Sequence, residues 1–156
     1  MTAITPSSTL SARWATPVHL AGSALLGVVG LAHLLVVHAF GGPDSPAEET
    51  VNELSAHVST ALFEGGRQLS VFDLNTGYSV GMGLFGLLFG LLAIAAVRSA
   101  PQLIARWSLF NGICVAAAGG LCWIALLYFP EPVIVVSIIA TLCFTTVLVA
   151  GPRESA

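Results

Sequence analysis

The sequence predicts an all-α fold: a transmembrane four-helix bundle with one extra amphipathic, extracytoplasmic helix. Hydrophobic residues make up 56% of the 156 residues and charged residues only 8%, whereas soluble domains average about 25% charged residues. Four apolar runs each approach the roughly 20 residues that a helix needs to cross a bilayer. The only long polar segment carries helix-capping residues. A water-soluble fold is therefore excluded, and residues 1–156 are expected to form a single membrane domain.

The four predicted spans follow the apolar runs in order. They cover about residues 17–40, 77–97, 107–129 and 133–150. The fourth run is the shortest and contains Ser and Thr, but these hydroxyls can bond back to the helix backbone, and no charge interrupts it. Prolines in the last two connections cannot continue a helix easily. Because these connections are short, the last three spans are expected to be antiparallel neighbours.

Arginine positions predict the orientation. Four of the five arginines fall on one side of the predicted bilayer: Arg13, Arg98, Arg106 and Arg153. Positively charged loops stay on the cytoplasmic side, so both termini are expected to be cytoplasmic.

The polar segment after the first span predicts a helix over about residues 46–64. Ser45 is a typical N-cap, Pro46 suits the first helical position, and Glu48 completes a capping box. Gly65 and Gly66 are expected to end the helix. One face is apolar and is expected to lie on the outer end of the bundle: Val51, Leu54, Val58 and Leu62. Adsorption on anionic lipid is the alternative, but such helices are usually basic, whereas this one is acidic.

Small residues form stripes on the second and third spans. Gly77 and Gly81 share one face of the second span, and a nearly opposite face carries Gly83, Gly86 and Gly90. The third span offers a matching stripe: Ser108, Gly112, Ala116, Gly119 and Gly120. Such stripes let helix backbones approach closely in lipid. Packing within the monomer is the expected use, and a dimer seam is the alternative.

Three of the four histidines lie on the first span, and His33 is the one expected to need a partner. By helix rise it should lie about 10 Å below Phe40, at the depth of Tyr78 and Ser137. It either hydrogen-bonds a hydroxyl or carbonyl of a neighbouring helix, or carries a proton or a ligand. The candidate site at this outer mouth comprises His33, Asp73, Asn75, Tyr78 and Ser137.

No cofactor or metal site is expected. In an α-helix, His33 and His38 would point about 140° apart, so they could not hold one metal or haem. The chain has no lysine and no basic cluster, which excludes a nucleic-acid partner. Hydrolase, phosphate-binding and dinucleotide motifs are missing, as is a carboxylate at mid-membrane. The expected partners are the lipid bilayer and a second copy or another membrane protein.

Three segments carry a family resemblance. Residues 71–83 read VFDLNTGYSVGMG, residues 87–92 read LLFGLL, and residues 127–132 read LYFPEP. Together they resemble a family of small, uncharacterised bacterial four-span membrane proteins with no established activity. The resemblance covers about the second half of the chain and implies a bundle in the bacterial inner membrane. It draws attention to four residues at the outer mouth: Asp73, Gly77, Tyr78 and Ser79.

The pattern favours a non-catalytic membrane subunit or accessory protein that packs through its glycine stripes. The alternative is a small homo-oligomeric channel or transporter whose path runs under the outer helix past His33 and Tyr78. A redox or lipid-processing enzyme that uses His33 with Asp73 is the third and weakest hypothesis.

Overall fold

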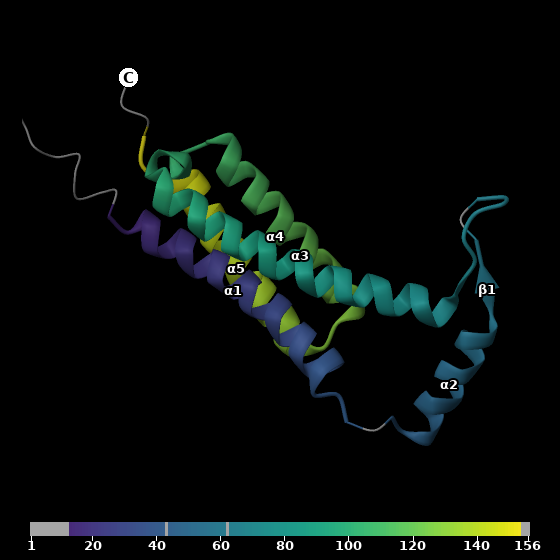
Figure 1. Ribbon diagram of the computed structural model, residues 1–156. Coiled ribbons are helices and arrows are strands. Elements are labelled where there is room, and N and C mark those ends of the chain that lie inside the picture. The colour runs from purple at the N-terminus through teal and green to yellow at the C-terminus, as the bar shows by residue number, and fades with distance from the viewer. Residues whose placement is uncertain (1–12, 43, 62, 154–156) are drawn as a thin grey trace, which may run out of the picture. The chain divides into compact units, whose positions relative to one another are not determined.

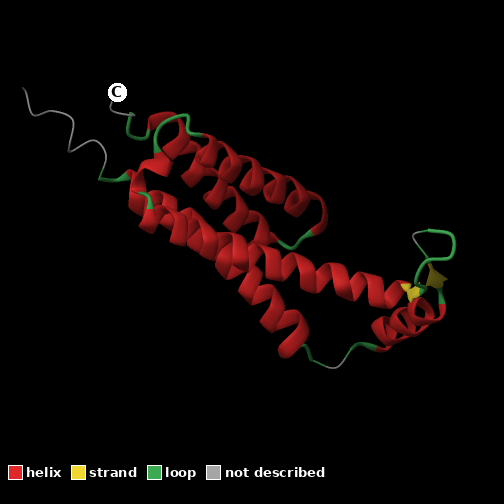
Figure 2. Ribbon diagram, turned by 45° about the horizontal axis from the view of Figure 1, so that its top comes forward, coloured by secondary structure: helices red, strands yellow, loops and turns green. Residues whose placement is uncertain are grey.

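The computed structural model describes residues 13–42, 44–61 and 63–153. Within these ranges helices dominate, and the strands are one short pair (Figure 2). Four helices are long and apolar enough to cross a membrane: Ala15–Ala39, Val71–Ser99, Leu109–Tyr128 and Glu131–Ala150. The predicted all-α class and the four spans are confirmed, and the chain is a multi-pass membrane protein.

The chain divides into two compact units. The first, called the bundle unit, contains the chain up to Val29 and from Gly86 onward. The second, called the hairpin unit, is Gly30–Phe85. Helices α1 (Ala15–His33) and α3 (Val71–Ser99) contribute residues to both units.

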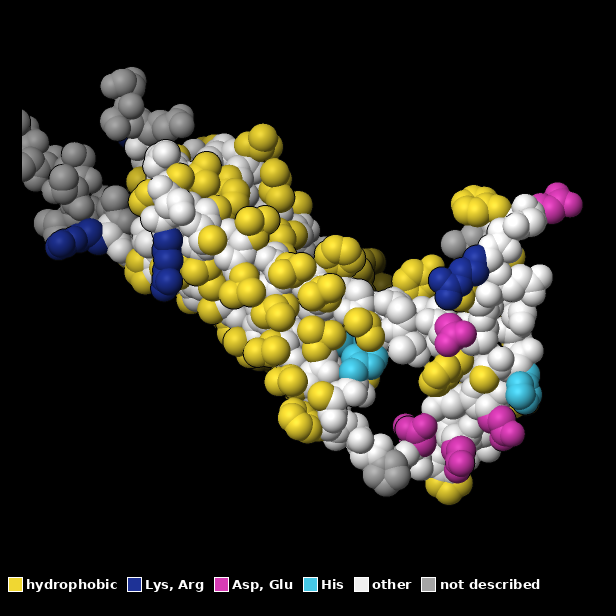
Figure 3. All heavy atoms as spheres, in the orientation of Figure 1, with side chains coloured by type: hydrophobic (Ala, Val, Ile, Leu, Met, Phe, Trp, Pro, Cys, Tyr) yellow, Lys and Arg dark blue, Asp and Glu magenta, His cyan; other side chains and the backbone are white. Residues whose placement is uncertain are grey.

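In the bundle unit, parts of α1 and α3 join α4 (Leu109–Tyr128) and α5 (Glu131–Ala150). Helices α4 and α5 lie side by side (Figure 1). Gly27 and Gly90 let α1 and α3 meet, because a Cβ on Gly90 would lie 2.6 Å from the Gly27 nitrogen. Phe144 fills the centre of the core with four smaller neighbours: Leu26, Cys114, Ala118 and Ala140. Hydrophobic side chains also cover the visible outside of these helices, as expected for surfaces facing lipid (Figure 3).

The turn before α4 is tied to the end of α5. A 3-10 turn, Pro101–Ile104, precedes Trp107, which has a left-handed φ of 60°. The Arg106 nitrogen donates to the Pro152 carbonyl at 2.6 Å, and the Trp107 nitrogen donates to that of Leu148 at 3.0 Å. These two bonds hold the chain in the conformation that Trp107 adopts.

In the hairpin unit, α1 continues as a π-helix over Leu34–Ala39. The Phe40 nitrogen donates to the Leu35 carbonyl at 2.7 Å, a bond that spans five residues. Helix α2 (Pro46–His57) follows. Its capping box is confirmed: the Glu48 nitrogen donates to Ser45 Oγ at 3.3 Å, and the Ser45 nitrogen donates to Glu48 Oε2 at 2.8 Å.

The predicted end of α2 is wrong. The helix stops at His57 instead of residue 64, and the chain forms β1 (Ser59–Thr60), which pairs antiparallel with β2 (Leu69–Ser70). β-branched residues such as Val58 and Thr60 favour extended backbone. Gly65, with φ of 75°, lies in the segment that joins the strands and does not cap the helix.

The predicted apolar face of α2 is not packed within the hairpin unit. Val51 and Leu54 are 63% and 64% exposed, and Val58 is also exposed. Leu62 lies outside the described residues.

The predicted start of the second span, residue 77, is also wrong, because α3 begins at Val71. The cause is a cap at Ser70. Its hydroxyl accepts from the Asp73 nitrogen at 3.0 Å and donates to Asp73 Oδ2 at 2.7 Å. Asp73 and Asn75, which precede the predicted start of the second span, therefore lie in the first turns of α3.

Candidate functional site

Two histidines converge on one serine in the hairpin unit. The Nε2 atom of His33 lies 2.9 Å from Ser79 Oγ, and the Nε2 atom of His38 lies 3.0 Å from the same oxygen. His33 and Ser79 are half-buried, whereas His38 is exposed. These three residues are called the His–Ser–His cluster below. His33 thus bonds the hydroxyl of a neighbouring helix, one of the two roles expected for it.

The π-helix brings the two imidazoles together. The expectation that His33 and His38 point about 140° apart is wrong, because it assumed α-helical geometry throughout. Hydrogen bonds that span five residues widen the helical turn, so positions five apart lie nearer to one face than they do in an α-helix. The ring centroids are 5.7 Å apart, with an interplanar angle of 75°. π-bulges occur frequently at functional sites, which makes this segment the first candidate in the hairpin unit.

Gly83 seats the cluster against α3. A Cβ at Gly83 would lie 2.8 Å from Leu34 Cγ and 3.1 Å from His33 Cδ2. Ser79 lies one helical turn before Gly83, on the same face of α3. The missing side chain therefore allows α1 to come close enough for its imidazole to reach the serine hydroxyl.

The other predicted site residues lie outside the cluster. Asp73 is exposed and bonded to Ser70, Asn75 is exposed, and Tyr78 is 66% exposed. Ser137 belongs to the bundle unit, is fully buried, and donates to the Ile134 carbonyl at 2.9 Å. His38 was missed as a site residue, and Ser79 was singled out only by the family resemblance.

On the second span, two glycines of one predicted stripe lie against α1 and not against the third span, which offered the matching stripe. Gly83 and Gly90 contact α1, and Gly86 is half-buried. Gly77 and Gly81 have no described atom within 4 Å of a Cβ position. On α4, a Cβ at Gly119 would lie 4.0 Å from Thr141 Cγ2, and a Cβ at Gly112 or Gly120 would meet nothing within 4 Å in the described part of the chain. Ala116, between them, is exposed.

The bundle unit buries polar side chains of its own. His19 is fully buried between two aromatic rings, with centroids 5.5 Å from Phe110 and 4.8 Å from Phe144. Asn111, also fully buried, donates to the Ala105 carbonyl at 3.2 Å. His19 Nε2 and Asn111 Oδ1 have no hydrogen-bond partner among the described residues. No hydrogen bond joins these two atoms, so they do not define a site.

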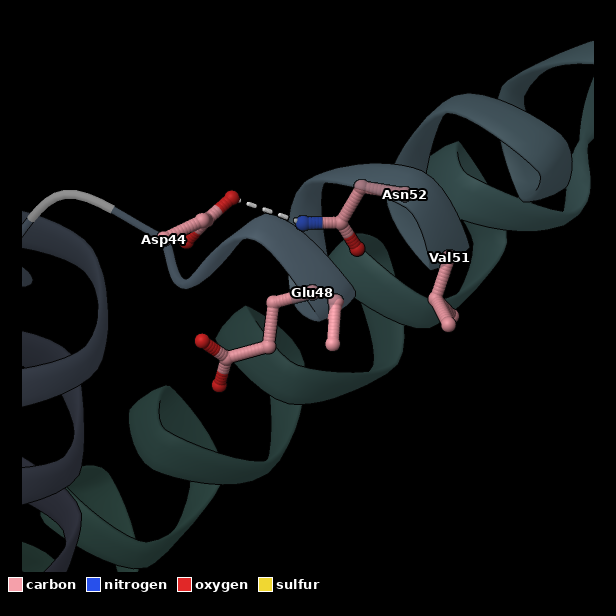
Figure 4. Close-up of a pocket in the computed structure, with 5 residues that line it drawn as sticks. Asp44, Glu48, Val51 and Asn52 are labelled. Atoms are coloured by element: carbon pink, nitrogen blue, oxygen red, sulfur yellow. Dashed lines mark hydrogen bonds between the residues drawn. The ribbon is translucent and has the colours of Figure 1, made fainter.

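Acidic side chains gather over α2 (Figure 3). An open hollow of about 340 Å³ lies there beside Asp44, Glu48 and Asn52, and Asn52 Nδ2 donates to Asp44 Oδ2 at 2.8 Å (Figure 4). Glu48 points away from that pair (Figure 4). Its hydrogen bonds with the Ser45 hydroxyl and with the Ser45 backbone hold the pKa of Glu48 below its ordinary value. Across the described ranges, no three His, Cys, Asp or Glu side chains come together as metal ligands.

A comparison with known protein families, curated proteins and solved structures found no match for this chain. Two features of the described residues are candidates for function: the His–Ser–His cluster and the open row of small residues on α4.

Proposed function

We propose that the protein is a non-catalytic membrane subunit that binds a second copy of itself, or another membrane protein, through α4. The observation that carries this proposal is the open row of small residues at Gly112, Ala116 and Gly120, spaced four apart. Residues spaced by four lie on one helical face. Gly83 and Gly90 of the stripe on α3 are already covered by α1, whereas no described atom covers Gly112 or Gly120.

Lipid makes such a face useful for association. Helices in a bilayer gain nothing from hiding apolar side chains, because lipid tails are equally apolar. Close backbone contact at small residues is what favours helix pairing there. In this proposal the protein lies in a bacterial inner membrane, in line with the family resemblance. Four crossings put both termini on one side, and the arginine distribution supports the cytoplasmic side.

Substitution on α4 tests the proposal. Gly112→Leu with Gly120→Leu should abolish energy transfer between donor- and acceptor-labelled copies in liposomes, while the fold of each copy survives because both positions are open. Ala117→Leu, at an exposed position on another face of the same helix, is the matched control and should leave energy transfer unchanged. An equal loss of energy transfer in both variants contradicts the proposal. The absence of energy transfer in the unmodified protein, both between its copies and to any co-purified membrane protein, also contradicts it.

A second function is favoured by the His–Ser–His cluster: a small homo-oligomeric channel or transporter that passes protons by way of His33, with Tyr78 near the path. Ionisable groups within membrane spans commonly mark ion pathways and proton relays. The cluster combines an exposed imidazole, a hydroxyl and a half-buried imidazole. In proteoliposomes with a trapped pH dye, an imposed pH gradient should collapse faster than in empty vesicles. His33→Gln should stop this, whereas His57→Gln, on exposed α2, should not.

A further inference from the structure

The number of polar hydrogens in the His–Ser–His cluster restricts the tautomers of its two histidines. Ser79 has one hydroxyl hydrogen, so it can donate to one imidazole nitrogen only. Both Nε2 atoms lie within hydrogen-bond distance of its oxygen. For both bonds to exist between neutral rings, one Nε2 must carry a proton and donate, while the other must be bare and accept. The two histidines are then locked in opposite tautomers.

We propose that the Ser79 hydroxyl relays a proton between His38 and His33. This inference rests on the second function proposed above and names how the site would carry its proton. One orientation of the cluster has His38 Nε2–H donating to Ser79 Oγ, while the Ser79 hydroxyl donates to His33 Nε2. The opposite orientation reverses both bonds, and the relay is the passage from one to the other.

The proton balance of one passage is complete. A proton arrives at the bare Nδ1 of exposed His38 and makes an imidazolium. The Nε2–H bond of His38 breaks as a new O–H bond forms on Ser79, while the original hydroxyl proton passes to His33 Nε2. His33 then releases its Nδ1 proton to water. One proton has entered and one has left, the net charge is unchanged, and both hydrogen bonds persist in the reversed sense.

No other titratable group in the described chain is bonded to the two imidazoles, so they can exchange protons with each other. The cluster is formed by the π-helix and the facing stretch of α3. That stretch, Val71–Phe85, contributes two titratable residues, Asp73 and Tyr78. Asp73 is bonded to Ser70, and Tyr78 is exposed. No carboxylate in the described chain bonds either ring, so a positive charge that reaches His38 is not fixed there by an ion pair.

Nitrogen-15 NMR of histidine-labelled, full-length protein in lipid nanodiscs tests the relay. Imidazole nitrogen shifts distinguish the two neutral tautomers. At mildly alkaline pH, the Nε2–H populations of His33 and His38 should sum to one per molecule. Ser79→Ala should remove this complementarity, because each ring then follows its own preference, and Ser79→Thr, which keeps the hydroxyl, should restore it. Thr76→Val removes a hydroxyl one turn away on α3 and should have no effect, and exposed His57 serves as the internal reference.

The outcomes separate the relay from transport. Populations that do not sum to one in the unmodified protein, or that Ser79→Ala leaves unchanged, overturn the relay. Complementary tautomers together with a proton flux that Ser79→Ala abolishes support both the relay and the transport function. Complementary tautomers without any flux in proteoliposomes support the relay and overturn the transport function. A flux that survives Ser79→Ala overturns the relay as its path.

Discussion

The bundle unit and the hairpin unit are stabilised by different interactions. In the bundle unit, Phe144 and Ala118 are fully buried, and α1 touches α3 at glycine backbones. In the hairpin unit, neither the π-helix nor α2 has a buried residue in its described length. Apart from the close approach of Gly83 to Leu34 and His33, its geometry is set by polar bonds: the caps at Ser45 and Ser70 and the His–Ser–His cluster. Changes in volume should therefore damage the bundle unit, and loss of single hydroxyls should damage the hairpin unit.

The largest effect is expected from Phe144→Ala. The side chain is fully buried at the centre of the bundle core, and its removal leaves a cavity that costs about 3–5 kcal/mol. Reversible unfolding by SDS in bicelles measures the free energy. Phe85→Ala, in the hairpin unit, removes a ring that is 73% exposed and should stay within about 0.5 kcal/mol of the unmodified protein. Similar losses for the two variants would contradict the distinction between the units.

A pair of glycine substitutions should change stability in opposite directions. Gly90→Ala forces a Cβ to within 2.6 Å of backbone atoms of Ser23 and Gly27, and such overpacking costs about 1–3 kcal/mol. Gly81→Ala, on the same helix but within the hairpin unit, meets no described atom within 4 Å. It should stabilise by up to about 1 kcal/mol through helix propensity. The same unfolding assay checks both, and a stabilising Gly90→Ala would show that α1 and α3 do not meet at this point.

Ser70→Ala should weaken the start of α3 without changing the bundle unit. Loss of an N-cap costs about 1 kcal/mol, and the cost should be confined to the first turns of the helix. Hydrogen exchange of the amides of residues 71–75 should speed up, while amides in α4 and α5 stay as protected as before. Ser70→Thr keeps a capping hydroxyl and should restore most of the protection. Faster exchange throughout all four spans would refute a local role for this cap.

The sequence predicted what hydropathy and local capping control. Each span is a long apolar run, and in lipid the backbone N–H and C=O groups of such a run must hydrogen-bond to each other in a helix. All four spans were therefore predicted. The start of α2 was found because Ser45, Pro46 and Glu48 stand together in a local pattern. The same kind of pattern exists at Ser70 and Asp73. This second cap was not predicted, because the polar residues that follow it lower the hydropathy of the first turns of α3 and so move the start of the apolar run to residue 77.

The site was harder to predict, because its geometry depends on a change of helix type. Nothing between Leu34 and Ala39 marks a change from α- to π-helical hydrogen bonding. α-helical spacing therefore predicted that the side chains of His33 and His38 point in different directions. The depth argument did identify His33 as a residue in need of a hydroxyl partner, but periodicity could not say that this hydroxyl belongs to Ser79. The end of α2 failed for a related reason, because pairing of Thr60 with Leu69 overrides local helical periodicity.

The smallest expected effect is a loss of α2 helicity in acid. The pKa of Glu48 lies below its ordinary value, first because of the Ser45 hydroxyl and then because of the Ser45 backbone nitrogen. A carboxyl whose pKa is lower in the folded than in the unfolded chain binds fewer protons when folded. The contribution of Glu48 to the stability of the helix start is therefore complete above its pKa in the unfolded chain and disappears as pH falls through its pKa in the folded chain.

Carbon-13 chemical shifts of residues 46–50 test this expectation. They should be constant above pH 4.5, which is the ordinary pKa of this group, and should move toward coil values in stronger acid. Because Glu48 is fully exposed, the change should be confined to the first turn. Glu48→Gln cannot titrate, so its shifts should stay flat over the same range, and an equal acid transition in that variant would assign the effect to another group.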